Sequence, residues 1–347
     1  MTKLVGLDVG YGFVKATDGE SGYSFPSVVG EGHTKPTFSI RSNHMPVIDN
    51  LKIEMGQKLY YVGKAAVRQS KFVYRDLSYT RATGDDFEIL FYSALSLFCP
   101  NRTNEFKVVT GLPVERIHLA KDLEKRVRGE RNIKIFRGGE IRDTRVYVSE
   151  VEIVPQPLGT YWSQFLNLDG GEEVPMEGLT GIIDIGFRTT DLAAIEDGEY
   201  IPEKSKSLSV GLATAYSDVG SKLATEYGLE KESYALDGII IKRKINISGQ
   251  ALDITDIVVS AFEKLAINIL VEINSQWRIS DFDNLILTGG GGQAISSYLL
   301  SQLPQAKLAV DPITANCRGY LAWGNWLWQL AGIHEETGVN SEQEFAR

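Results

Sequence analysis

Short apolar runs alternate with amphipathic stretches along most of this 347-residue chain. The runs at 3–9, 106–110 and 284–288 are continuous and are bounded by glycine, proline or polar residues, which is typical of buried strands. Residues 85–98 and 253–276 instead repeat apolar side chains at helical spacing, which predicts two amphipathic helices. This alternation of strands and helices predicts a mixed α/β fold.

The same patterns predict the elements between these segments. Further strands are expected at 12–17, 23–28, 52–53, 59–62, 133–137 and 146–154, and further helices at 114–128, 156–165, 212–228 and from about 293. A last helix is expected after Asn316, and its tryptophans, Trp323, Trp326 and Trp328, are expected to anchor the core because large aromatic side chains dominate packing.

One sequence pattern occurs twice. Near its start the chain reads LVGLDVGYGFVK, and much later it reads GIIDIGFRTTDL. When Asp8 is aligned with Asp184, Gly10 falls on Gly186, so each copy is an apolar strand that ends in Asp-x-Gly and then turns. A single Asp-x-Gly is often only a turn. Two aligned copies instead predict two related half-domains that hold one phosphate chain between them.

The residue types in both copies suit a phosphate chain with a bound metal ion. Carboxylates such as Asp8 and Asp184 bind Mg²⁺ directly or through its water shell. Glycines let backbone N–H groups approach phosphate oxygens, and a lysine adds a point positive charge. The candidate groups are Gly10, Tyr11, Gly12 and Lys15 in the first copy and Gly186, Phe187, Arg188 and Thr189 in the second.

A run of four glycines, Gly289 to Gly292, follows the expected strand at 284–288. Without Cβ atoms, a planar ring or a phosphate can lie close to the backbone. The next helix, expected to begin near Gln293, adds a field that favours anions. A flexible loop is the alternative, but the position between a strand and an amphipathic helix favours a nucleotide contact.

These three segments, in this order, resemble the actin/Hsp70/sugar-kinase superfamily. The two hairpins are similar to its two phosphate motifs, and 287–291 is similar to its adenosine motif. Residues 151–159 and 311–324 resemble its two connections between domains. The motifs Asp-x-Gly-Tyr-Gly-x-x-Lys, Thr-Gly-Leu-Pro, Pro-Gln-Pro and Ala-Asn-x-x-Gly-Tyr are most similar to plasmid-partitioning actins of the ParM type.

The resemblance implies an actin-like (ribonuclease H-like) duplicated two-domain α/β fold with a nucleotide cleft between the halves. Domain I would comprise residues 1–156 plus 311–347. Domain II would comprise residues 157–310, with a smaller lobe over about 212–282.

The resemblance also implies catalytic and binding roles. Asp8 and Asp184 would orient a hydrated Mg²⁺, and Gln156 would position the attacking water. The expected phosphate contacts are Gly10, Tyr11, Gly12 and Lys15 on one side and Gly186, Phe187, Arg188 and Thr189 on the other. The expected nucleoside contacts are Gly289, Gly290 and Gly291, with Gly211 and Lys222 as further candidates; a solvated surface lysine is the alternative for Lys222.

Two residues depart from the family pattern. Tyr11 stands where actin has a small hydroxyl residue, so its contact to the γ-phosphate would come from the backbone alone. Phe187 replaces a carboxylate or glycine, which changes the surface of the second turn.

The function implied is a nucleotide-driven, filament-forming ATPase that binds Mg²⁺ and ATP, with GTP also open. Its subunits would add head to tail, and a DNA-binding adaptor would connect the filament to plasmid DNA. Two alternatives stay open: a small-molecule kinase of the same fold, and a nucleotide-sensing scaffold that does not polymerise. The kinase needs an aspartate base near the acceptor hydroxyl, where this chain offers Gln156.

Charge and composition narrow the partners. A formal net charge of −9 opposes a broad electrostatic grip on nucleic acid, so direct binding to DNA is not expected. No apolar run reaches the ~18 residues of a membrane span, so no membrane partner is expected. Two cysteines in apolar surroundings and no recognisable signal peptide suit a cytoplasmic protein.

Overall fold

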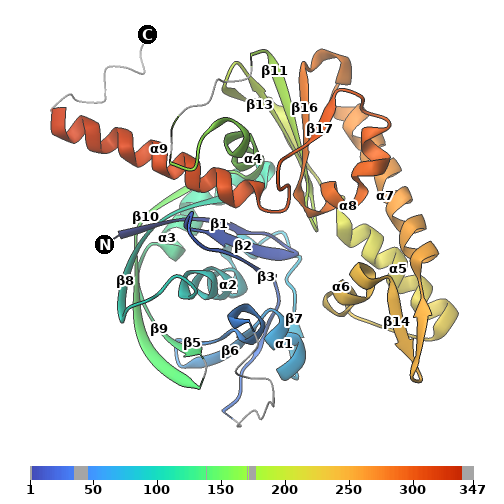
Figure 1. Cartoon of the computed structure of the whole chain (residues 1–347), viewed down its shortest axis with the longest axis horizontal. Helices are drawn as coiled ribbons and strands as arrows, with labels where there is room; N and C mark the ends of the chain where they lie inside the picture. Colours follow the sequence, from blue (N-terminus) through green and yellow to red (C-terminus); the bar gives the residue numbers. More distant parts are fainter. Residues whose placement is uncertain (1, 35–45, 138, 170, 172–176, 338–347) are drawn as a thin grey trace.

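Two β-sheets, one from each half of the chain, form the framework of the molecule (Figure 1). The computed structural model describes residues 2–34, 46–137, 139–169, 171 and 177–337. The first sheet has the strand order β3-β2-β1-β8-β10-β9-β5-β6-β4-β7 and the second has the order β13-β12-β11-β16-β17. A separate two-stranded hairpin, β14-β15, lies in the second half.

The strands of the first sheet come from the first 155 residues. They are β1 (Thr2–Val9), β2 (Phe13–Thr17), β3 (Gly22–Pro26), β4 (Val29–Glu31), β5 (Lys52–Met55), β6 (Lys58–Val62), β7 (Val73–Tyr74), β8 (Thr103–Leu112), β9 (Gly129–Arg137) and β10 (Glu140–Pro155). The strands of the second half are β11 (Leu179–Ile185), β12 (Thr190–Glu196), β13 (Glu199–Leu208), β14 (Lys244–Ile247), β15 (Gln250–Asp253), β16 (Asn284–Thr288) and β17 (Ala306–Leu308).

The two sheets repeat one arrangement, which confirms the expected duplication. In the first, β1 pairs with β2 in antiparallel fashion and with β8 in parallel fashion. In the second, β11 pairs with β12 antiparallel and with β16 parallel. The hairpins also share a register: Asp8 lies opposite Lys15, and Asp184 lies opposite Asp191. Because parallel strands end at the same sheet edge, both Asp-x-Gly turns are presented at a carboxyl edge.

Nine α-helices are assigned in the described part of the chain, and several short 3-10 turns accompany them. The α-helices are α1 (Lys64–Gln69), α2 (Asp85–Ser96), α3 (Ala120–Val127), α4 (Gln156–Phe165), α5 (Leu212–Tyr227), α6 (Ser233–Lys242), α7 (Thr255–Gln276), α8 (Gly289–Leu300) and α9 (Ala315–Thr337). The 3-10 turns are Val47–Asn50, Arg81–Thr83, Val114–Leu119 and Ile279–Asp281.

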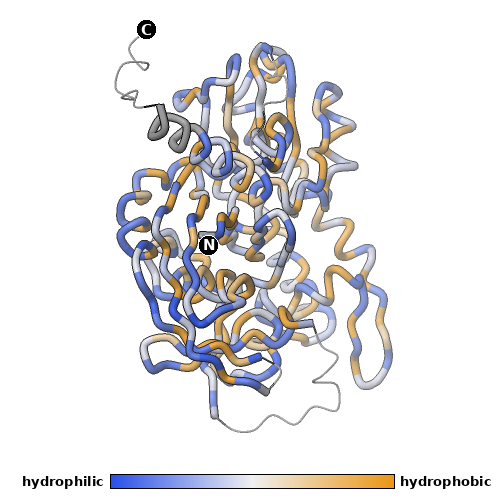
Figure 2. The backbone as a smooth tube through the Cα atoms, turned by 60° about the vertical axis from the view of Figure 1, so that its left-hand side comes forward, coloured by the Kyte–Doolittle hydropathy of each residue, from blue (hydrophilic) through white to orange (hydrophobic). Residues whose placement is uncertain are grey.

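Each half has its own large hydrophobic core. In the first, the curved sheet wraps around α2 (Figure 1), a helix that is buried along nearly its whole length. In the second, α5, α7 and α8 supply apolar side chains that pack with those of β11, β12 and β16. Figure 2 shows hydrophobic and hydrophilic residues alternating along most of the backbone.

Helices α4 and α9 connect the two sheets. They pack against each other, while α9 also contacts β1 and β8 and α4 also contacts β11. The division into domain I (1–156 plus 311–347) and domain II (157–310) stays a prediction. In the described residues, no helix combines the length and hydropathy needed to cross a membrane.

Two predictions of local structure were wrong. Helix α8 begins at Gly289 rather than near Gln293, so the glycines form its first turn. Residues 114–128 do not form the single α-helix that was predicted: Val114–Leu119 is a 3-10 turn, and α3 begins only at Ala120. The expectation for the tryptophans of α9 is confirmed in part: Trp323, Trp326 and Trp328 are only partly buried, but Trp323 and Trp328 pack against a small core cluster of Val109, Val154 and Tyr320.

Candidate functional site

A cleft of about 530 Å³ lies between the two halves, and residues of both halves line it. Most of the predicted site residues meet there. They are Asp8, Gly10, Tyr11, Gly12, Lys15, Gln156, Asp184, Gly186, Phe187, Thr189, Gly289, Gly290 and Gly291. Three predicted residues are not among those that line the cleft: Arg188, Gly211 and Lys222.

The first hairpin places a carboxylate and a cation side by side. Asp8, at the end of β1, is only 3% exposed. Because Lys15 lies opposite it in the register, the Lys15 Nζ reaches Asp8 Oδ2 at 2.9 Å. Burial alone would lower the pKa of Lys15, but the Asp8 carboxylate outweighs burial and the pKa is raised. The first half therefore contributes a charge-compensated pair.

The turn of this hairpin has no room for larger residues. A Cβ on Gly10 would lie 2.8 Å from the Phe13 carbonyl oxygen and 3.2 Å from Lys15 Nζ. A Cβ on Gly12 would lie 2.9 Å from the Cβ of Phe187 in the second half. The glycines thus allow both the tight turn and the close approach of the two halves.

Tyr11 is held between two guanidinium groups of the first half. The Cζ atoms of Arg81 and Arg116 lie 4.8 Å and 5.3 Å from its ring centroid. Its hydroxyl donates to the Ser78 carbonyl oxygen at 3.2 Å. Cation–π attraction of this kind fixes the ring, and the hydroxyl is already bound to Ser78.

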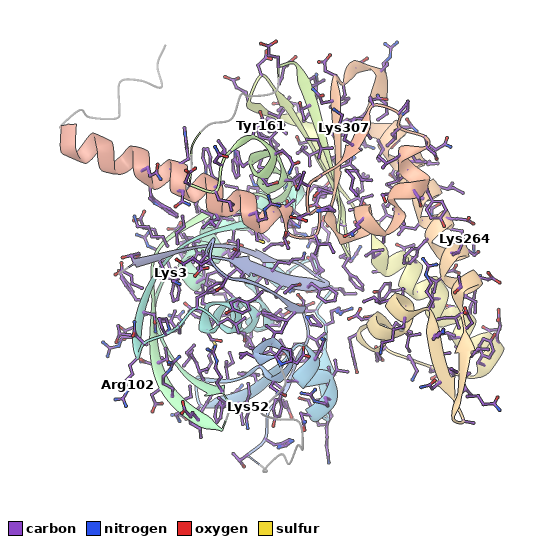
Figure 3. The ribbon with its side chains drawn as sticks, in the orientation of Figure 1. Lys3, Lys52, Arg102, Tyr161, Lys264 and Lys307 are labelled. Carbon is purple, nitrogen blue, oxygen red and sulfur yellow. The ribbon has the colours of Figure 1, made fainter. Side chains whose placement is uncertain are left out.

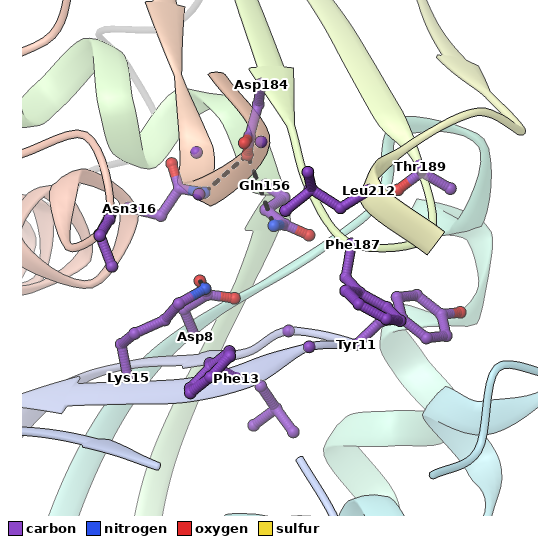
Figure 4. A pocket seen from close by; sticks show the side chains of 18 of the residues that line it. Asp8, Tyr11, Phe13, Lys15, Gln156, Asp184, Phe187, Thr189, Leu212 and Asn316 are labelled. Carbon is purple, nitrogen blue, oxygen red and sulfur yellow. Dashed lines mark hydrogen bonds and ion pairs between the residues drawn. The ribbon is translucent and has the colours of Figure 1, made fainter. Parts of the chain in front are cut away.

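The second hairpin carries a buried carboxyl group, Asp184, that forms no ion pair with any lysine or arginine in the described part of the chain. Asp184, at 2% exposed, accepts hydrogen bonds from Asn316 Nδ2 at 2.8 Å and Gln156 Nε2 at 3.4 Å (Figure 4). Burial, with the charges of Asp191 and Asp8, raises the pKa of Asp184 to about 7, although the Asn316 hydrogen bond and the charge of Lys15 act to lower it. The second half therefore contributes a buried carboxylate that would gain from a nearby cation.

The second turn is held from behind by the start of α5. Backbone N–H groups of Leu212 and Ala213 donate to the carbonyl oxygens of Gly186 (3.1 Å) and Phe187 (2.7 Å). A Cβ on Gly211 would lie 2.8 Å from that Phe187 oxygen, so Gly211 supports the turn without lining the cleft. Arg188 points elsewhere, with its Nη1 donating to the Ser209 carbonyl oxygen at 3.3 Å.

The third glycine cluster packs against the second hairpin. Gly289 has a φ of +84°, a left-handed conformation that favours glycine. A Cβ there would lie 2.4 Å from Asp184 Oδ1, and one on Gly291 would lie 2.4 Å from Ile185 Cγ2. The glycines therefore bring the first turn of α8 to the edge of the cleft, where the Gly289 N–H donates to the Pro312 carbonyl oxygen at 3.1 Å.

Sequence reasoning missed an apolar wall on the second half of the cleft. Its members come from α5, α6, α7 and α8: Leu212, Tyr216, Ile240, Ile241, Val258, Phe262 and Ala294, with Arg243 beside them. These are ordinary helix residues, and no local signal distinguishes them from core residues. Asn316 was also missed as a site residue, although the Ala-Asn-x-x-Gly-Tyr motif contains it.

Comparisons with known proteins agree with this architecture. Residues 6–159 match the family described as actin-like proteins, N-terminal domain, and residues 182–300 match archaeal actin homologue MreB-like, C-terminal. An archaeal actin homologue of Thermoplasma volcanium is 27% identical over 193 residues, which cover 52% of this chain. The chain spans 56% of the length of that curated relative.

Two solved structures share the fold. A 15-stranded ParM filament from Clostridium botulinum has a TM-score of 0.78 at 24% identity, over 93% of this chain and 99% of that one. An archaeal actin homologue in complex with ADP has a TM-score of 0.73 at 22% identity, over 92% of this chain and 98% of that one. With both family matches in order along one duplicated fold, the chain belongs to the actin-like proteins, related to ParM and the archaeal actin homologues.

Proposed function

We propose that this chain binds a nucleoside triphosphate with Mg²⁺ between its halves, hydrolyses it, and assembles head to tail into filaments. The observation that carries the proposal is the meeting of two equivalent Asp-x-Gly hairpins in one cleft. A phosphate chain placed there would meet backbone N–H groups from both turns and the Lys15 ammonium. Catalysis in such a site is mainly positioning and charge stabilisation.

The nucleoside would lie on the apolar wall of the second half. Tyr216, Ile240, Val258 and Phe262 offer a surface for a purine ring, and Gly289 to Gly291 leave room beside it. Arg243 lines the cleft together with these apolar residues. Its guanidinium would therefore be the polar contact to the base or the ribose. This wall does not by itself choose between ATP and GTP.

Asp8 and Asp184 would hold the metal ion, directly or through water. Both are buried carboxylates that line the cleft, and oxygen ligands are what Mg²⁺ prefers. The uncompensated charge of Asp184 fits a divalent cation, because such a cation would offset the cost of burying the carboxylate. When bound, Mg²⁺ would neutralise phosphate charge.

Gln156 would position the attacking water. It begins α4, its backbone carbonyl oxygen accepts a hydrogen bond from the Tyr320 hydroxyl at 3.0 Å, and its side-chain amide points toward Asp184. An amide takes no proton at neutral pH, so Gln156 would orient the water rather than act as a base. An aspartate base, as a small-molecule kinase requires, is absent at this position.

Self-assembly and plasmid segregation rest on the family rather than on the cleft. A similar structure is a ParM filament, and a heterologous contact that does not close produces a filament. The net charge of −9 favours an adaptor protein over direct contact with DNA. We propose that the filament moves plasmid DNA through such an adaptor.

The test is light scattering with parallel pelleting in Mg-ATP, Mg-GTP and Mg-ADP, with phosphate release measured in the same samples. We expect scattering to rise above a critical protein concentration in ATP or GTP, and then to decay as phosphate appears. Steady turnover that depends on an acceptor, with flat scattering, would identify a kinase. Binding without turnover or scattering would identify a nucleotide sensor; either result would overturn the filament proposal.

A further inference from the structure

Arg75 reaches from the first half of the molecule to the second. It directly follows β7, and its side chain is only 1% exposed. Its guanidinium makes two hydrogen bonds to Asp237 on α6: Nη2 to Oδ2 at 2.5 Å and Nη1 to Oδ1 at 3.3 Å. A forked, buried ion pair of this kind has defined geometry and leaves costly unpaired charges when it breaks.

The same guanidinium lies on the second phosphate turn. The Arg75 Cζ is 4.6 Å from the ring centroid of Phe187. Tyr216, from the apolar wall of the cleft, also packs on Phe187, with the two ring centroids 5.0 Å apart in an edge-to-face contact. Arg75 therefore contacts the residue that departs most clearly from the family pattern in that turn.

Helix α6 takes part in both the cleft and this contact. Its residues Ile240 and Ile241 line the cleft, while Asp237 binds Arg75. Its first turn also touches the first half, where Tyr234 packs against a small cluster around Val28. Figure 1 shows α6 beside β7, on the side of the second half that faces the first.

We propose that Arg75 is a positioning residue that latches α6 and the second phosphate turn to the first half, and that this latch limits the rate at which nucleotide leaves. The inference rests on the proposed nucleotide site. Both partners of Arg75, Asp237 and Phe187, belong to the second half, so an opening of the cleft that separates the halves breaks the ion pair and the ring contact together. Because Arg75 contacts both Phe187 in the turn and Asp237 on α6, a ligand bound at the turn would change how firmly the two halves are held together.

The experiment measures release of a fluorescent ATP analogue, chased with excess ATP, at protein concentrations below the onset of light scattering. Arg75→Ala and Asp237→Asn are each expected to speed release by roughly tenfold, within the range of coupling energies between contacting residues. The double variant should release no faster than either single variant, because both remove the same contact. Arg75→Lys, which keeps the charge but loses the fork, should fall between wild type and Arg75→Ala.

The control is Lys264→Ala. Lys264 pairs with Asp218 at 3.1 Å within the second half, on α7 at the outer edge of the molecule (Figure 3), so the pair does not cross between the halves. Release should stay at the wild-type rate in this variant. Wild-type release rates in both Arg75→Ala and Asp237→Asn, or equal acceleration in Lys264→Ala, would overturn the latch.

A second readout separates the latch from the proposed function. Amide hydrogen exchange without nucleotide should be faster in residues 233–242 of Arg75→Ala than of wild type, while the core strand β11 stays equally protected. If wild type binds no nucleotide, the proposed function fails, and the exchange of α6 still decides whether Arg75 holds the halves together. Unchanged exchange in α6 would then overturn the latch as well.

Discussion

The two hairpins that meet at the cleft share a register and differ in the residue that faces the aspartate. In the first, Lys15 lies opposite Asp8 and binds it at 2.9 Å. In the second, Asp191 lies opposite Asp184. Asp191 is itself buried and accepts hydrogen bonds from the Thr189 hydroxyl (2.9 Å) and the Val114 backbone N–H (3.2 Å). One copy of the duplicated hairpin thus pairs its aspartate with a lysine, whereas the other places two aspartates opposite each other.

This difference suggests how duplication produces an asymmetric site. In the proposed site the first hairpin would supply the Lys15 ammonium to the phosphate as well as the Asp8 carboxylate to the metal ion, whereas the second would supply the Asp184 carboxylate alone. Burial raises the pKa of both Asp184 and Asp191, and the hydrogen bonds that each accepts only partly offset it. Such halves would be complementary to different parts of one ligand, a metal–phosphate complex.

The largest expected effect follows removal of the unbalanced carboxylate. Asp184→Ala should slow nucleotide hydrolysis by roughly 10²- to 10³-fold, the scale for loss of one preorganised charged or polar group in a transition state. Phosphate release at saturating nucleotide measures this, with circular dichroism to verify folding. Undiminished turnover in a folded variant would contradict the site assignment.

The comparison also predicts opposite stability effects in the nucleotide-free protein. Asp184 has a pKa raised from 3.8 to about 7, so the folded state keeps a proton that the unfolded chain releases, and the free energy of unfolding falls as pH rises through this window. Asp184→Asn removes that cost and should be more stable than wild type at pH 8 by about 2–4 kcal/mol, with the gain vanishing near pH 4. Chemical denaturation at several pH values measures both.

Asp8→Asn is the matched variant in the first hairpin. It leaves the Lys15 ammonium buried without its partner, so the free energy of unfolding at pH 8 should fall rather than rise. Equal shifts in the same direction for the two variants would show that the hairpins do not differ electrostatically.

Gln156 lies where the two hairpins meet, and its loss should have a smaller effect. Gln156→Ala is expected to slow hydrolysis roughly tenfold to a hundredfold, because the attacking water loses its orientation but the charges remain. Filaments should persist longer after nucleotide is exhausted. Electron microscopy of a time course gives their lifetime, and faster disassembly would contradict the water-positioning role.

The smallest effects are expected on nucleotide affinity, from substitution of two cationic side chains of the second half, Lys222 and Arg243. Lys222 is partly exposed on α5 and does not line the cleft, whereas Arg243 lines it at the end of α6. Arg243→Ala should weaken nucleotide affinity by roughly two- to fivefold and Lys222→Ala by less than about twofold, as expected of partly exposed charges. Titration of a fluorescent nucleotide measures both, and the reverse order would restore Lys222 as the contact.

The sequence predicted best those features that depend on local backbone chemistry. The hairpins around Gly10 and Gly186, the strand at 284–288 and the helix that begins at Gln156 all appear where their patterns placed them. Each depends on a buried apolar run followed by a residue that permits or forces a turn, and both properties can be read from neighbouring residues.

Features that depend on contacts between distant segments were not predictable in this way. The start of α8 was placed after the glycines, because glycine is a poor helix former. In the fold Gly289 and Gly291 are required by the approach of Asp184 and Ile185, and the helix follows from there. The apolar wall and the Arg75–Asp237 pair likewise arise only when α6 and β7 meet across the cleft.

The central claim is that both hairpins hold one nucleotide at the same time. Amide hydrogen exchange with and without Mg-ATP, below the concentration at which filaments form, tests it most directly. We expect one nucleotide per chain and simultaneous protection of residues 10–14, 186–190 and 289–292. Protection confined to one half, or nucleotide that binds while both turns exchange as before, would contradict the claim.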